Sequence, residues 1–148
     1  MKVPYFVPWI TPEDKKFVLN SLDQQWLTNG PMLQRFENNF KKNIHSKYAT
    51  GVGSATHALH LSVKALGIKE NDEVIVPTFT FAATANAVKY CNAKPVLVDV
   101  ESDTFNISPK MISKKITKKT KAIIVVHYGG QSCNMDEIKT IAKKHNLS

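Results

Sequence analysis

The sequence predicts an α/β fold with a mainly parallel sheet and helical crossovers. Two observations carry this prediction: short apolar segments alternate with helical segments from residue 48 onward, and the apolar segments are continuous runs of Val and Ile. Continuous apolar runs are typical of strands buried on both faces, as parallel strands usually are. The length of 148 residues is that of one ordinary domain and is enough to bury a sizeable core.

Two helices are expected before residue 48. The first spans 12–22, because Thr11 is a good N-cap, a proline stands at the first helical position and acidic residues follow in the first turn. The turn-rich segment 25–31 ends it. The second helix is expected over 32–43, with one apolar face through which it should pack. That face is formed by Leu33, Phe36 and Phe40.

The alternating pattern continues to the end of the chain. Strands are expected over 48–52, 73–77, 95–100 and 122–126. Helices are expected over 56–66, 81–91, 109–118 and 135–145. The chain stops at residue 148, where another strand should follow the last helix, and we therefore expect residues 1–148 to be an N-terminal fragment. The edge of the last strand should then be uncovered and should favour aggregation.

Composition excludes several classes of protein. The formal charge of +8 is concentrated between residues 109 and 148, where nine lysines and two acids give a net of +7. Those lysines decorate two predicted helices and are expected to be solvated surface, so no nucleic-acid partner is predicted. No apolar run approaches membrane-spanning length, and the opening segment 1–5 does not resemble a signal peptide. The two cysteines match no metal-ligand spacing, which favours a reducing cytoplasm and no metal site.

Three loops at the expected carboxyl edge of the sheet carry unusual residues. The first, residues 51–56, combines glycines with Ser54 and Thr56 at the start of a helix, where unpaired N–H groups can cradle an anion. The motif is neither a dinucleotide fingerprint nor a Walker loop, and a simple helix cap without a ligand is the alternative. The second loop, 77–87, holds Phe79 and Phe81, either of which can stack on a flat ring or belong to the core.

The third loop, 127–131, follows the last predicted strand and supplies His127 and Tyr128 beside two glycines. These residues lie close to the expected crevice, but a loop histidine without a catalytic role is the commoner outcome. No carboxylate pair, Ser-His-Asp arrangement or metal cluster is recognisable, so a self-contained hydrolase is not supported.

Taken together, these segments resemble the DegT-type (DegT/DnrJ/StrS) family of nucleotide-sugar aminotransferases. The order and spacing of seven segments, which span almost the whole chain, carry the resemblance. They are WLTNGP (26–31), GSATHAL (53–59), NDEVIVP (71–77), TF with ANA (80–87), PVLVDV (95–100), NI (106–107), and HYGG with NMD (127–136). The resemblance implies pyridoxal 5'-phosphate as the cofactor and the N-terminal part of the fold type I aminotransferase large domain as the structure.

The resemblance also implies roles for particular residues. Ala55 and Thr56 match the positions that contact the cofactor phosphate, with Ser54 as a neighbour. Phe81, the aromatic residue after a threonine, matches the position that stacks on the pyridine ring, where many relatives have Trp or Tyr. Thr28 matches a residue near the sugar substrate.

Two decisive parts of the family pattern are not found in residues 1–148. These are the lysine that binds the cofactor covalently and the acid that pairs with the ring nitrogen. The resemblance places both beyond residue 148, so no catalytic residue is assigned in this chain and the piece by itself is expected to be inactive. The implied parent enzyme is a homodimer that transfers an amino group from glutamate to a nucleotide-linked keto-deoxysugar. A dehydratase relative with histidine in place of the lysine, and a noncatalytic phosphate-binding α/β module, are the alternatives.

Overall fold

The computed structural model describes residues 4 and 7–148, so most of the opening segment 1–5 lies outside the described residues. The chain divides into two compact units, residues 1–51 and 52–148, and each is described by itself. No described helix is both long enough and apolar enough to cross a membrane.

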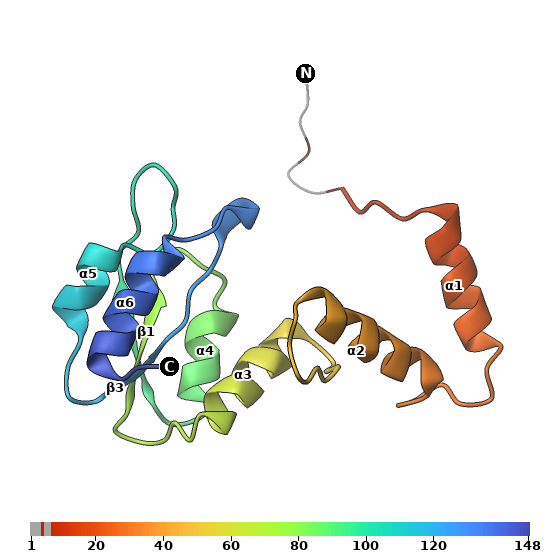
Figure 1. Cartoon of the computed structure of the whole chain (residues 1–148), viewed down its shortest axis with the longest axis horizontal. Helices are drawn as coiled ribbons and strands as arrows, with labels where there is room; N and C mark the ends of the chain where they lie inside the picture. The colour runs from red at the N-terminus through yellow and green to blue at the C-terminus, as the bar shows by residue number, and fades with distance from the viewer. Residues whose placement is uncertain (1–3, 5–6) are drawn as a thin grey trace. The chain divides into compact units, whose positions relative to one another are not determined.

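The first unit contains the two helices that the sequence predicts (Figure 1). Helix α1 spans Pro12–Leu22, and the Thr11 hydroxyl accepts from the Asp14 backbone N–H while the Asp14 carboxylate accepts from the Thr11 N–H. This reciprocal cap lowers the pKa of Asp14, chiefly through the Thr11 backbone. Helix α2 spans Pro31–Asn43. Its expected packing face is not buried in the described chain, since Phe36 and Phe40 contact each other but remain exposed.

The predicted strand over 48–52 is wrong, because no described residue of this segment belongs to a sheet. The backbone here bonds to a side chain instead of a neighbouring strand: the Gly51 N–H donates to Glu37 Oε1 at 2.7 Å. A side chain on Gly51 would also collide with Leu33. Helix α2 therefore holds this segment through side-chain contacts.

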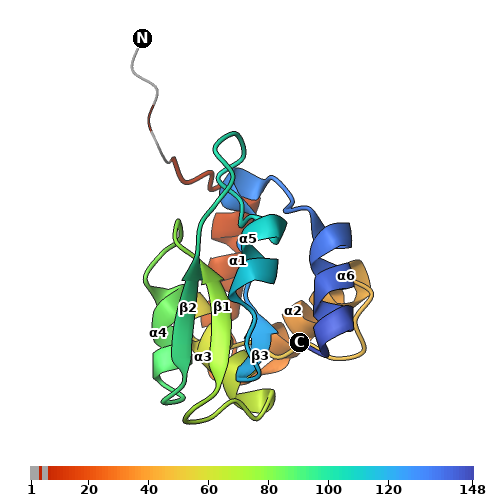
Figure 2. The same cartoon turned by 90° about the vertical axis from the view of Figure 1, so that its left-hand side faces the viewer.

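The second unit is built on a three-stranded parallel sheet (Figure 2). Its strands are β1 (Glu73–Pro77), β2 (Lys94–Val98) and β3 (Thr120–Ile123), in the order β2-β1-β3. The central strand β1 is buried throughout and pairs Glu73 with Lys94 on one side and with Thr120 on the other. The fold class predicted from the sequence is confirmed.

Helices cover both faces of this sheet, as parallel strands require (Figure 1). They are α3 (Ala55–Ala65), α4 (Ala83–Lys89), α5 (Pro109–Lys115) and α6 (Met135–His145). One core cluster packs α3 and α4 on the sheet, and the other packs α5 and α6 on the opposite face. The first contains Val63, Val74, Val76, Ala87, Val88 and Ala122. The second contains Ile75, Val98, Ile107, Ile112, Cys133 and Ile138.

Several boundaries differ from the predicted ones for physical reasons. Strand β3 ends at residue 123 instead of 126. The Ile124 N–H still donates to the Ile75 carbonyl. The next donor in a parallel ladder would be the N–H of residue 77, but Pro77 has none. Strand β2 is an edge strand and is not buried on both faces, with Leu97 55% exposed. The free edge of β3 is partly occupied, since the Ser148 N–H donates to the Lys121 carbonyl and the Ser148 carbonyl accepts from Ile123.

A buried carboxylate joins the strands at their amino ends. Glu73 is 6% exposed, accepts from the Thr117 hydroxyl at 2.6 Å and contacts the Lys94 ammonium at 3.1 Å. The Thr117 hydrogen bond is the largest influence and lowers the pKa of Glu73, against an opposing effect of burial, and Lys94 lowers it further. Glu73 therefore links β1 to β2 and to the segment before β3.

Candidate site at the carboxyl edge of the sheet

The order and direction of the elements place three segments of the second unit toward the carboxyl edge of the sheet, where open α/β folds bind ligands. They are the start of α3, the loop between β1 and α4, and the loop between β3 and α6. The order of the strands places the loop after β1 between the other two, because β1 is the central strand and α3 and α6 cover opposite faces.

The start of α3 is a preorganised set of hydrogen-bond donors. Ser54 adopts an extended conformation and its hydroxyl accepts from the His57 N–H at 3.2 Å, which caps the helix. The N–H groups of Ala55 and Thr56 are the first two of the helix and have no partner within it. Thr56 is half-buried, and its hydroxyl stands beside these donors in sequence. Ser54, Ala55 and Thr56 are the residues that the sequence predicts as an anion cradle, and their contact with a phosphate stays a prediction.

The electrostatics of this helix start favour an anion. The first turn of α3 contains no acidic residue, so nothing in the helix competes with a ligand for the positive end of its dipole. A phosphate group needs hydrogen-bond donors and a positive potential, and both are present here. These residues therefore fit the phosphate of pyridoxal phosphate.

The loop after β1 presents an aromatic ring to solvent. Phe81 is 80% exposed, directly before helix α4, so it is not a core residue in this structure. The Thr80 and Thr84 hydroxyls lie 2.8 Å apart and hydrogen-bond across the first turn, which shapes the loop on either side of Phe81. Helix α4 begins at Ala83, two residues later than predicted. An exposed ring at this edge is available to stack on a flat ligand.

The loop after β3 orients its histidine ring through a backbone hydrogen bond. The Cys133 backbone N–H donates to His127 Nδ1 at 3.1 Å, so Nδ1 is the acceptor and the neutral ring carries its proton on Nε2. His127 is exposed, whereas Cys133 is buried and its thiol donates to the Val126 carbonyl. Burial raises the pKa of the Cys133 thiol, which makes it a structural group and a poor nucleophile.

Asn106 holds the same loop and was not anticipated as a site residue. It is 4% exposed, its Nδ2 donates to the carbonyls of Gln131 and Ser132 at 3.1 and 3.2 Å, and its Oδ1 accepts from the Tyr128 N–H at 2.9 Å. The sequence marked Asn106 as part of a motif, but its partners are 22 to 26 residues away and no local pattern reveals them.

Thr28 belongs to the first unit and lies in the exposed loop between α1 and α2. The loop is sterically tight at Gly30, where a Cβ atom would stand 2.7 Å from the Trp26 carbonyl oxygen and 3.0 Å from that of Thr28. Glycine is therefore required at this position for the observed backbone. The predicted role of Thr28 beside a sugar substrate stays a prediction.

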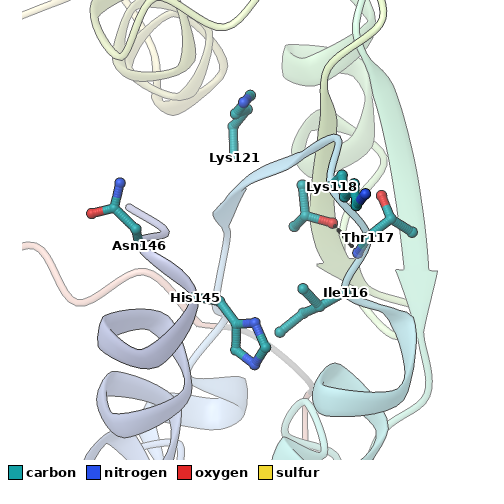
Figure 3. A pocket seen from close by; sticks show the side chains of 7 residues that line it. Ile116, Thr117, Lys118, Lys121, His145 and Asn146 are labelled. Atoms are coloured by element: carbon teal, nitrogen blue, oxygen red, sulfur yellow. Dashed lines mark hydrogen bonds between the residues drawn. The ribbon is translucent and has the colours of Figure 1, made fainter.

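A hollow of the second unit lies at the opposite edge of the sheet (Figure 3). It has a volume of about 570 Å³ and is lined by the segment before β3 and the end of α6, including Lys118, Lys121 and His145. It is remote in topology from the start of α3, so it is not part of the candidate site. Among residues 4 and 7–148, no three His, Cys, Asp or Glu side chains gather as a metal site would require.

Comparison with known proteins identifies the family of this chain. The profile of the DegT/DnrJ/EryC1/StrS aminotransferase family matches residues 8–148. A GDP-perosamine synthase of Escherichia coli O157:H7 is 46% identical over 146 residues, which is 98% of this chain and 40% of that protein. The chain thus spans about 40% of the length of this curated relative.

Solved structures share the fold. A sugar aminotransferase from Streptococcus pneumoniae in its PLP form superimposes with a TM-score of 0.90 at 32% identity, over 97% of this chain and 37% of that one. A GDP-4-keto-6-deoxymannose-3-dehydratase superimposes with a TM-score of 0.90 at 28% identity, over 99% of this chain and 39% of that one. The family match covers nearly the whole chain, and these folds agree with it over the same length. The chain therefore belongs to the DegT/DnrJ/EryC1/StrS aminotransferase family.

Proposed function

We propose that the whole protein is a pyridoxal-phosphate-dependent sugar aminotransferase. It transfers an amino group from glutamate to a nucleotide-linked keto-deoxysugar, in the synthesis of amino sugars for glycans. The observation that carries the proposal is the pair of free N–H groups at Ala55 and Thr56, on the same edge of the sheet as the exposed ring of Phe81. One end of that arrangement suits a phosphate and the other suits a flat ring.

Each residue has a distinct task in this proposal. The Ala55 and Thr56 N–H groups and the Thr56 hydroxyl hold the cofactor phosphate, while Ser54 keeps the helix start in shape by capping it. Phe81 stacks against the pyridine ring and limits its tilt. Thr28 contacts the sugar. The bound cofactor supplies an electron sink that acidifies the carbon bearing the transferred nitrogen.

The proposed proton transfers require a lysine, and the lysines of α3 and α4 do not suit this role. Lys64 and Lys89 are exposed on α3 and α4, and Lys89 borders a hollow at the amino edge of the sheet, away from the candidate site. We place the reactive lysine and the acid facing the ring nitrogen in the part of the whole protein beyond residue 148. Residues 1–148 are then a partial large domain, and the glutamate donor, homodimer and cytoplasmic location stay predictions.

A dehydratase is the second candidate, because one solved neighbour is a GDP-4-keto-6-deoxymannose-3-dehydratase with a trapped PLP-glutamate geminal diamine. The two functions share the phosphate cradle and differ in the residue that moves protons.

The test is incubation of the whole protein with pyridoxal phosphate, ¹⁵N-glutamate and GDP-4-keto-6-deoxymannose, with the products analysed by mass spectrometry. An aminotransferase places ¹⁵N in the sugar nucleotide. A dehydratase yields a sugar that has lost a hydroxyl and gained no nitrogen. Cofactor binding without conversion of this or other nucleotide-linked ketosugars supports a noncatalytic module and refutes the proposed transfer.

A further inference from the structure

A short hairpin after β2 connects two loops of the candidate site. Residues 99–107 turn back on themselves through an antiparallel bridge between Val100 and Ile107, and the Ser108 N–H donates to the Asp99 carbonyl. Phe105 near its tip has a positive φ of 56°, which is unusual for a residue with a large side chain. The fold therefore maintains a costly backbone conformation at this tip.

One side of the tip fixes the loop after β3. Asn106 makes three hydrogen bonds, to the backbones of Tyr128, Gln131 and Ser132. They satisfy one N–H and two carbonyl groups in a segment that has no sheet or long helix to pair these groups. The same loop holds the His127 ring through Cys133. Asn106 thus determines where Tyr128 stands.

The other side of the tip reaches the loop that carries Phe81. The rings of Phe79, Phe105 and Tyr128 form a cluster in which every pair is in contact, with centroids 4.9 to 5.8 Å apart. These distances are those of favourable aromatic pairs. Phe79 comes two residues before Phe81, so the cluster anchors the segment from which Phe81 projects. From the sequence, Phe79 could be either a core residue or a ring that stacks on a ligand. The structure assigns it to this cluster.

We propose that Phe105 and Asn106 are positioning residues for the ring-stacking loop. Asn106 places Tyr128, and Tyr128 and Phe105 together hold Phe79 and hence the backbone that leads to Phe81. The link runs along the face of the sheet covered by α5 and α6, since Ile107, next to Asn106, belongs to that core. The phosphate cradle belongs to α3, on the other face. The hairpin therefore positions the loop that carries Phe81 and has no role in positioning the phosphate cradle.

The first test needs no cofactor. Hydrogen exchange of the whole protein is measured in the absence of pyridoxal phosphate for the wild type, Asn106→Ala and Phe105→Leu. Loss of the Asn106 hydrogen bonds should speed exchange by about tenfold or more in both segments 127–133 and 78–84. Phe105→Leu, which keeps an apolar side chain, should speed exchange in 78–84 more than in 127–133, because the Asn106 hydrogen bonds still hold the second segment.

The matched control is Thr120→Val. Thr120 is 5% exposed and its hydroxyl accepts from the Thr117 N–H at 2.9 Å, so the variant also loses a buried bond to backbone, but at the amino edge of the sheet. It should leave exchange in 78–84 unchanged. Two outcomes overturn the proposal. In one, Asn106→Ala speeds exchange in 127–133 and leaves 78–84 unchanged. In the other, Phe105→Leu has no selective effect on 78–84.

The second test concerns the ring itself and rests on the proposed function. Circular dichroism in the cofactor absorption band reports how the protein orients the bound ring. Phe105→Leu should change the band per bound cofactor by about half, whereas Thr120→Val should not change it. An unchanged band in Phe105→Leu contradicts the proposal. Failure of the wild type to bind pyridoxal phosphate contradicts the proposed function instead, and the exchange experiment still decides the coupling.

Discussion

Thr56→Val tests the phosphate cradle directly. The substitution keeps the β-branched shape of a half-buried side chain and removes one hydroxyl, while the Ala55 and Thr56 N–H groups stay in place. A hydrogen bond to a charged group contributes about 1.5–3 kcal/mol. The dissociation constant of pyridoxal phosphate should therefore rise by roughly ten- to a hundredfold.

The assay is equilibrium titration of the whole protein with pyridoxal phosphate, followed by absorbance of the bound cofactor. Ser62→Ala is the matched control, because it removes an exposed hydroxyl from the same helix without touching its first turn. Its dissociation constant should equal that of the wild type. Ser54→Ala should lower helix stability by about 1 kcal/mol through loss of the cap and weaken cofactor binding less than Thr56→Val does.

Two results would refute this reasoning. Unchanged affinity in Thr56→Val would show that its hydroxyl does not contact the phosphate. A larger loss in Ser54→Ala than in Thr56→Val would mean that Ser54 binds the phosphate itself, although its hydroxyl is occupied by the His57 N–H in this structure.

Three further predictions concern stability and specificity. Glu73→Gln should lower the free energy of unfolding by about 1–2 kcal/mol in urea unfolding at pH 7. Because the folded pKa of Glu73 is lowered, its contribution to stability is present above the unfolded pKa and is lost as pH falls through the folded pKa. The stabilities of wild type and variant should therefore converge in acid. A difference that persists unchanged in acid contradicts this. Gly30→Ala must displace the Trp26 or Thr28 carbonyl, so the KM for the sugar nucleotide should rise several-fold with unchanged cofactor affinity, and initial-rate kinetics with cofactor titration measure both. Ile112→Ala, at a fully buried position, should lower the free energy of unfolding by about 2–5 kcal/mol in urea unfolding. A loss of less than about 1 kcal/mol would show that the core collapses to fill the cavity.

The elements that the sequence predicted correctly are those with local signals. Helix α1 begins at Pro12 because Thr11 caps it and proline fits the first turn, and β1 is apolar from Val74 onward and buried throughout. The strand predicted over 48–52 failed because apolar content does not supply a pairing partner. The backbone of Gly51 instead uses the Glu37 side chain, a contact that depends on how helix α2 lies.

The candidate site could be recognised from the sequence where its residues form a contiguous segment. Ser54 to Thr56 combine cap, dipole and free donors within one turn, and family resemblance selected Phe81 over Phe79. The structure shows Phe81 more exposed than Phe79, at 80% against 44%. The role of Asn106 could not be predicted, because its partners come from another loop. The cluster of three rings that includes Phe105 could not be predicted either, because its members are separated by more than twenty residues in sequence.

The two faces of β1 contribute to different cores, with Val74 and Val76 on one side and Ile75 on the other. The sheet consequently separates the helix that we propose to hold a phosphate from the hairpin that we propose to orient the neighbouring loops. Substitutions on the two sides share few neighbours, so their free energies should be close to additive. Substitutions around the hairpin can then accumulate without a compensating change in the packing beneath the start of α3.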